Sequence, residues 1–285
     1  MTVHFEDLRL LVAAKKLQFT DDQLNWLLAH IGDLNPEIRD TTVYTLLSRG
    51  LTEDSFTTQQ KQTILRTVIT QNGLFKNIEQ PANDDVFCRT FTALLIAEIL
   101  ASDSQNFWLT EPQRQLFFND ALSYLPQELD QRGFVANKGW AHGIAHGSDL
   151  LDAAWCHPNF SAPQSHQALL VIASVFKRQS GFFIADEEPR LAIPIVHAMA
   201  SQHLSENTLT NWLQATNNHL WTDFSFDDLA ADARLHNWLS FLHHLYFLLP
   251  ETSINRPIIT HLSTQYYQRY GYQKPTTTLA KNPLV

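Results

Sequence analysis

Two histidines and an aspartate stand at a spacing that places three metal-binding or proton-transferring groups on one face of a helix. His142, His146 and Asp149 are related by steps of four and three residues. At about 100° per residue, such steps stack side chains on one side of an α-helix. Imidazole nitrogens and carboxylate oxygens are ligands that Zn²⁺ and related divalent transition metals accept. The pattern therefore predicts a metal site formed by His142, His146 and Asp149, or a polar ligand-binding face.

This pattern differs from the zinc-protease motif H-E-x-x-H, because Gly143 stands where the general-base glutamate would be. Asp149 is either a third ligand or a partner that orients one imidazole ring. A purely structural interpretation also stays open, in which both histidines close hydrogen bonds to the preceding loop. Asp152 lies at the edge of the same predicted face.

The helix that carries these side chains is expected over residues 138–155, with an apolar stripe on the opposite side. That stripe consists of Trp140, Ile144, Leu151 and Trp155. Between the two faces runs a line of glycines at positions 139, 143 and 147. Each glycine inside a helix costs about 1 kcal/mol relative to alanine. We therefore expect a neighbouring backbone or a ligand to approach this line closely.

The stretch 130–139 is expected to be the loop that precedes this helix, and it carries three charged residues. These are Asp130, Arg132 and Lys138. Loops on a rigid scaffold often carry function, although Asp130 and Arg132 could equally tie the loop down. The candidate ligand-binding residues are therefore Asp130, Arg132, Lys138, Trp140, His142, His146, Asp149 and Asp152, joined by Arg190 and His197 from a later helix.

The rest of the chain predicts an all-α fold without a sheet, because apolar residues recur at helical spacing and sustained alternation is absent. Proline follows a capping residue at Asn35-Pro36, and similar signals stand at 110–112 and 161–163. The expected helices cover residues 4–17, 20–31, 36–49, 57–72, 84–102, 110–125, 138–155, 163–179, 187–203, 206–221, 227–249 and 254–270.

Arginines recur near the start of four of the expected helices, at positions 39, 89, 190 and 234, and the missing member of this series falls near Gly139. A helix pair that returns after roughly 40–50 residues is typical of HEAT-like or armadillo-like α-solenoids. We therefore expect about five antiparallel helix pairs in one domain, residues 1–272, followed by a loose tail, 273–285. An irregular helical globule is the alternative.

In a solenoid, the second helices line a concave surface. The four arginines would then join Asp186 and the His142 face in one polar strip, or they would bond carboxylates between repeats and stabilise the stack. The sequence alone leaves both possibilities open.

Composition narrows the classes of function. The net charge of −9 argues against a general nucleic-acid-binding protein, which needs a basic surface. Apolar runs are too short for a membrane span. The two cysteines, Cys88 and Cys156, form no disulfide framework or cysteine zinc motif, so a reducing cytoplasm is expected and both are interpreted as packing residues.

The run DQRGFVANKGWAHGIAHGSDLL, which begins at Asp130, resembles a bacterial family known only as domain of unknown function 2785. Its arginine-glycine-phenylalanine turn and the following G-W-A-H-x-x-A-H-like helix carry the resemblance, which is looser over the rest of the chain. The resemblance implies an intracellular bacterial protein without an assigned activity, and it implies no catalytic residue.

Two hypotheses of function follow. In the first, the protein is a binding scaffold whose concave groove, centred on residues 138–155, holds a peptide, a protein or a small polar ligand. In the second, it is a metal-dependent enzyme, of a hydrolytic kind, whose divalent transition metal is held by His142, His146 and Asp149.

Overall fold

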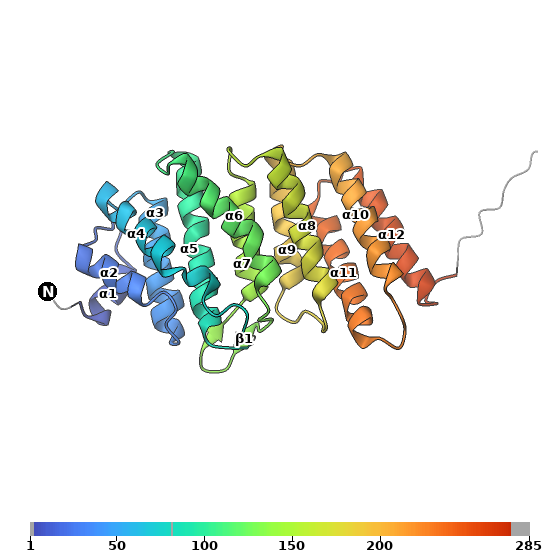
Figure 1. Cartoon of the computed structure of the whole chain (residues 1–285), viewed down its shortest axis with the longest axis horizontal. Coiled ribbons are helices and arrows are strands. Elements are labelled where there is room, and N and C mark those ends of the chain that lie inside the picture. The colour runs from blue at the N-terminus through green and yellow to red at the C-terminus, as the bar shows by residue number, and fades with distance from the viewer. Residues whose placement is uncertain (1–2, 81, 275–285) are drawn as a thin grey trace, which may run out of the picture.

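In the computed structural model, which describes residues 3–80 and 82–274, the helices follow one another in chain order along the longest axis (Figure 1). The predominantly helical fold is confirmed, and the described residues form twelve α-helices and two short irregular ones. The elements are α1 (Phe5–Leu11), α2 (Asp21–Ala29), the π-helix η1 (Glu37–Tyr44), α3 (Thr45–Thr52), α4 (Thr58–Gln71), the 3₁₀-helix η2 (Gly73–Phe75), α5 (Asp85–Gln105), α6 (Glu111–Gln127), β1 (Phe134–Val135), β2 (Gly139–Trp140), α7 (Gly143–Trp155), α8 (Ala162–Arg178), α9 (Glu187–Ala200), α10 (Glu206–Thr222), α11 (Leu229–Leu248) and α12 (Asn255–Arg269).

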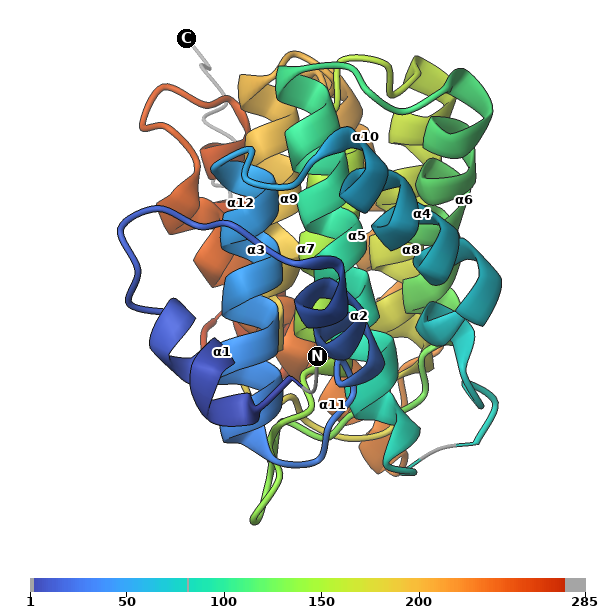
Figure 2. The same ribbon diagram turned by 90° about the vertical axis from the view of Figure 1, so that its left-hand side faces the viewer.

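From α3 onward the helices form two layers. In one layer, α3 packs on α5, α5 on α7, α7 on α9 and α9 on α11. In the other layer, α6 packs on α8, α8 on α10 and α10 on α12. Seen from the N-terminal end, α4, α6 and α8 lie on one side and α3, α5 and α7 on the other (Figure 2). We call the layer of α3, α5, α7, α9 and α11 the odd layer.

Four helices, α2, α4, α6 and α8, begin with the same local arrangement. A threonine or serine is the N-cap of α2, α4, α6 and α8, and a glutamine three residues later accepts a hydrogen bond from its backbone N–H. This capping box satisfies backbone donors that the first helical turn leaves unpaired. These caps fix where each of these four helices starts.

One large hydrophobic cluster extends from Leu8 to Tyr266 and fills the space between the layers, and a small second cluster of Val86, Phe87 and Ala141 lies beside the hairpin. Trp155 and Trp238 are among the largest fully buried side chains of the large cluster. Burying one large apolar side chain contributes roughly 1.5–3 kcal/mol, so this cluster supplies most of the driving force for stacking the helices.

The expectation of no sheet is wrong, because β1 and β2 pair as a small antiparallel hairpin with Phe134 opposite Trp140. The expected helix 138–155 therefore begins only at Gly143. Asn137 and Gly139 both have positive φ, 64° and 77°, which turns the chain back before the helix starts. Trp140 consequently lies on β2 and is 44% exposed, outside the core stripe that was predicted for it.

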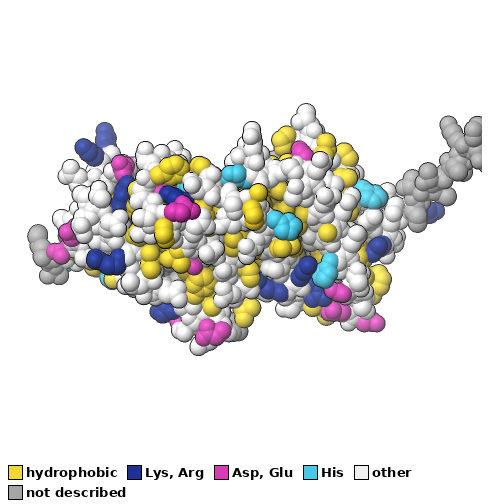
Figure 3. Space-filling model, turned by 45° about the horizontal axis from the view of Figure 1, so that its top comes forward, with side chains coloured by type: hydrophobic (Ala, Val, Ile, Leu, Met, Phe, Trp, Pro, Cys, Tyr) yellow, Lys and Arg dark blue, Asp and Glu magenta, His cyan; other side chains and the backbone are white. Residues whose placement is uncertain are grey.

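The surface carries both charged and apolar side chains. On the face drawn in Figure 3, basic and acidic side chains are interspersed in small groups, and apolar side chains lie between them. Within the described residues, no helix is long and apolar enough to cross a membrane. Most of the predicted loose tail, residues 275–285, lies outside the described residues.

Candidate functional site

The hairpin positions His142 at the start of α7. Backbone N–H groups of Ala141 and His142 donate to the carbonyls of Gly133 and Arg132 at 2.8 and 3.2 Å, which extends the pairing of the hairpin. His142 is the N-cap of α7 and has left-handed backbone angles, φ 52° and ψ 44°. Its ring stacks on the Trp140 indole, with centroids 4.4 Å apart and planes 1° from parallel. His142 is thus held outside the helical turn on which it was predicted.

His146 lies one turn into α7 and is only 8% exposed. Its ring meets Phe91 of α5 edge to face at 5.2 Å, and its centroid lies 5.4 Å from that of His142. The Nδ1 atoms of both histidines are buried and have no hydrogen-bond partner among the described residues. A buried polar atom without a partner costs about 1–3 kcal/mol, so each of these two nitrogens retains an unused capacity for a hydrogen bond.

Both imidazoles are neutral at pH 7. Burial lowers the pKa of His142 below its ordinary 6.5, and the positive charge of Arg190 lowers it further. Burial also lowers the pKa of His146 far below 6.5, with the neighbouring His142 and Arg190 acting in the same direction. A neutral imidazole has one nitrogen that donates and one that accepts, and it is the form that binds metals.

The third predicted member of the site, Asp149, pairs with Arg190 of α9. Both side chains are about one third exposed, 33% for Asp149 and 31% for Arg190. Burial raises the pKa of the Asp149 carboxyl, and Arg190 opposes this shift. The carboxylate is therefore engaged with a cation and does not complete a ligand set with the two histidines.

Three further polar residues that sequence reasoning missed lie beside this pair. The Tyr44 hydroxyl and the Ser48 hydroxyl donate to Glu98 of α5 at 3.0 and 2.8 Å. Burial, followed by the charge of Glu98, raises the pKa of Tyr44, and Asp149 contributes to the same shift. Tyr44 also touches Phe91, the aromatic ring that contacts His146. A polar strip thus crosses η1, α5, α7 and α9.

The next turn of α7 carries a second polar group. Asp152 Oδ2 lies 2.9 Å from His197 Nδ1 of α9, and the Cys156 thiol donates to Asp152 Oδ1 at 3.4 Å. The structure thus brings together Asp152 and His197, both predicted, with Cys156, which was interpreted as a packing residue.

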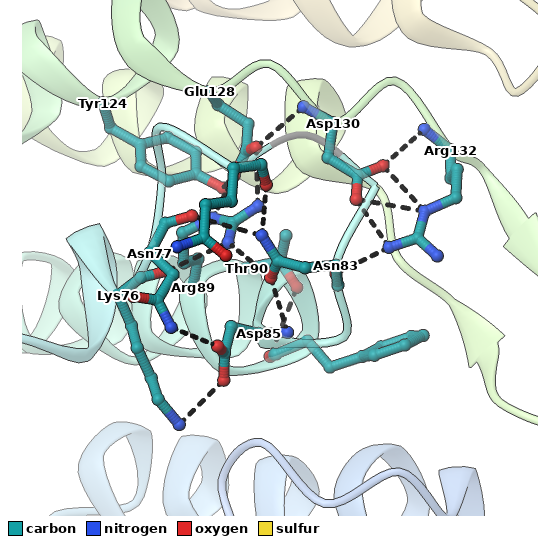
Figure 4. A network of polar contacts seen from close by, with 12 residues as sticks. Lys76, Asn77, Asn83, Asp85, Arg89, Thr90, Tyr124, Glu128, Asp130 and Arg132 are labelled. Carbon is teal, nitrogen blue, oxygen red and sulfur yellow. Dashed lines mark hydrogen bonds and ion pairs between the residues drawn. The ribbon is translucent and has the colours of Figure 1, made fainter.

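The charged residues of the preceding loop hold that loop in place. Arg132 donates to both carboxylate oxygens of Asp130 and to the carbonyl of Asn83 at 2.7 Å (Figure 4). Lys138 pairs with Asp84 at 2.6 Å, and its carbonyl accepts from Arg39 Nη2 at 2.8 Å. These contacts favour the interpretation that Asp130, Arg132 and Lys138 stabilise the loop rather than bind a ligand.

Two of the three predicted glycines are explained by close packing. A Cβ at Gly143 would lie 2.6 Å from the Asp130 carbonyl, and one at Gly147 would lie 2.6 Å from Leu125 and 2.7 Å from Tyr124. Helix α6 and the chain after it therefore approach α7 too closely for any side chain. The helical cost of these glycines is therefore offset by close packing, against the Asp130 backbone at Gly143 and against α6 side chains at Gly147, rather than by a ligand.

The recurring arginines link neighbouring segments. Arg89 of α5 forms a fully buried bidentate pair with Glu128, at 2.7 and 2.8 Å (Figure 4). Arg234 of α11 donates to the carbonyl of Gln179 after α8 at 3.2 Å, and Arg39 reaches Lys138. Arg190 pairs with Asp149 in the same way. Each of the four arginines therefore bonds to a residue outside its own helix pair, which favours the interpretation that they stabilise the stacking of neighbouring pairs.

Comparison with known proteins places the chain in a family. The model of a protein family of unknown function, DUF2785, matches residues 74–247, a span that includes α5 to α11 almost entirely. The chain belongs to this family. Neither the curated proteins nor the solved structures contain a match to it. The DUF2785 match thus covers the hairpin, both histidines and the Asp149–Arg190 pair.

Proposed function

We propose that this DUF2785 protein is a HEAT-like α-solenoid scaffold, one domain over residues 1–272, that binds a polar ligand on its odd layer. The observation that carries the proposal is the pair of buried, unpartnered Nδ1 atoms of His142 and His146 beside the Asp149–Arg190 pair. The scaffold part is supported by helices that stack in chain order and contact chiefly their neighbours.

The chemistry of the strip suits a peptide, a protein loop or a small molecule with several hydrogen-bonding groups. Each neutral imidazole offers a nitrogen that donates or accepts, and each such bond contributes roughly 0.5–1.5 kcal/mol. Arg190 and Asp149 offer a cation and a carboxylate that are still partly open to solvent. Trp140, 44% exposed, provides an apolar wall next to His142.

A metal-dependent hydrolytic enzyme stays as the second candidate, because two neutral imidazoles suit a divalent transition metal. A metal held by His142, His146 and Asp149 would have to displace Arg190 from the carboxylate. Elemental analysis of untagged protein, compared with the variant His142→Ala/His146→Phe, tests this candidate. Metal that is bound by both proteins equally would contradict it.

The binding proposal is tested by a thermal-shift screen of polar small molecules and short peptides, followed by calorimetry. The double variant His142→Ala/Asp149→Asn should weaken a binding compound roughly 10- to 100-fold, the effect of losing two or three hydrogen bonds. His166→Ala, an exposed histidine on α8, is the matched control and should bind as the wild type does. Equal affinity in all three proteins would contradict the proposal.

A further inference from the structure

Three metal-ligating side chains of different types converge where α7 and α9 meet. Asp152 and Cys156 stand one helical turn apart on α7, and His197 faces them from α9. One potential ligand atom from each lies within 4.8 Å of those of the other two. Within the described part of the chain, no other set of three histidine, cysteine or acidic residues converges in this way.

The present distances are close to those of a tetrahedral metal site. Zn²⁺ binds sulfur at about 2.3 Å and nitrogen or oxygen at about 2.0–2.2 Å, so ligand atoms in a tetrahedron lie roughly 3.3–3.8 Å apart. Here the carboxylate of Asp152 lies 2.9 Å from the imidazole nitrogen and 3.4 Å from the thiol sulfur. The imidazole nitrogen and the thiol sulfur lie within 4.8 Å of each other, so rotations of these side chains would bring the three ligand atoms to tetrahedral spacing.

The helices hold this cluster firmly while solvent can reach it. Trp155 and Ala198, next to Cys156 and His197 in sequence, are completely buried and fix the two helices against the core. The side chains of Asp152 and His197 are 23% and 54% exposed. An ion can therefore enter from solvent, and a fourth coordination position would face water.

We propose that Asp152, Cys156 and His197 form a zinc site with three protein ligands and a fourth position open to water. The donor set selects the ion class, because thiolate and imidazole favour Zn²⁺ over Mg²⁺ or Ca²⁺, which require oxygen ligands. The site is distinct from the ring nitrogens of His142 and His146. A negative result for the zinc site would therefore not count against the proposed binding function.

Binding requires the Cys156 thiol to lose its proton, which passes to solvent as the sulfur–metal bond forms. In the metal-free protein, the thiol donates this proton to Asp152 Oδ1 in a hydrogen bond of 3.4 Å.

Titration of the untagged full-length protein with Co²⁺, followed by competition with Zn²⁺, tests the proposal. A stoichiometric cobalt complex should show tetrahedral d–d bands and a thiolate-to-cobalt charge-transfer band, both abolished by Zn²⁺. Cys156→Ser should remove the charge-transfer band, and His197→Gln should weaken binding at least tenfold.

The matched controls are Cys88→Ser and His166→Ala, which should leave both the band and the affinity unchanged. Circular dichroism of each variant establishes that it is folded. The proposal is overturned if Co²⁺ does not bind, if it binds without the thiolate band, or if the band survives in folded Cys156→Ser.

Discussion

The buried pair of Arg89 and Glu128 provides the sharpest prediction about stability. Both side chains are 0% exposed, and Glu128 accepts from Arg89 at 2.7 and 2.8 Å, from the Tyr124 hydroxyl at 2.8 Å and from the Asp130 N–H at 2.9 Å. Replacement of Arg89 by leucine removes two of these four bonds and leaves a carboxylate without its cation in the core. We expect Arg89→Leu to lower the free energy of unfolding by roughly 3–5 kcal/mol.

A second substitution separates the lost charge from the lost packing. Adding Glu128→Gln to Arg89→Leu removes the uncompensated charge but keeps an acceptor for Tyr124 and Asp130, so about 1–3 kcal/mol should be regained. Arg9→Leu is the control, because Arg9 and its partner Glu6 are 52% and 66% exposed, and such a pair contributes about 0–1 kcal/mol.

Urea unfolding followed by far-ultraviolet circular dichroism measures all three variants against the wild type. The reasoning is refuted if Arg89→Leu is no more destabilising than Arg9→Leu. It is also refuted if Glu128→Gln, added to Arg89→Leu, lowers stability further instead of restoring part of it.

Three further predictions concern packing and pH. Gly147→Ala should lower unfolding stability by roughly 1–3 kcal/mol in urea, because its Cβ would meet α6 at 2.6 Å, whereas Gly181→Ala, with no atom within 4 Å, should change it by less than about 1 kcal/mol. Because the pKa of His146 lies far below 6.5 in the folded protein, only the unfolded chain takes up this proton as pH falls below about 6.5. As the pH falls below about 6.5, the free energy of unfolding of the wild type should therefore decrease by up to about 1.4 kcal/mol per pH unit more than that of His146→Phe. Equal slopes of the free energy of unfolding against pH in the two proteins would contradict this. Burial raises the pKa of Asp120 from 3.8 to about 6, so its ionised form is disfavoured in the folded state. Asp120→Asn should therefore stabilise the protein by roughly 1–3 kcal/mol above pH 6, with the gain vanishing below about pH 4, in thermal melts across this range.

Helical periodicity predicted most of the architecture, because apolar residues recur at helical spacing and several helices have a local start signal. The four threonine or serine caps with glutamine three residues later were a further regular signal in the chain. The start of α7 was missed because Trp140 stands four residues before Ile144 and fits the helical stripe. Asn137 and Gly139, with one residue between them, were the local sign of a turn there.

The candidate site could be predicted only where its members lie close together in sequence. His146, Asp149 and Asp152 share a face of α7, as their spacing indicated. Tyr44 and Glu98 come from helices far away along the chain, and only the tertiary packing of η1 and α5 on α7 brings them near. Cys156 follows the buried Trp155, a position that predicts a packing residue. It also stands four residues after Asp152, and this spacing was the available signal for its role.

Histidine-selective ¹⁵N NMR of the protein, with and without a ligand from the screen, is the most direct test of the binding proposal. In the free protein at pH 7, His142 and His146 should both show the nitrogen shifts of neutral imidazole, and saturation with ligand should move their Nδ1 resonances. The exposed His166 should not respond. A ligand that binds tightly while both Nδ1 resonances stay in place would contradict the proposal.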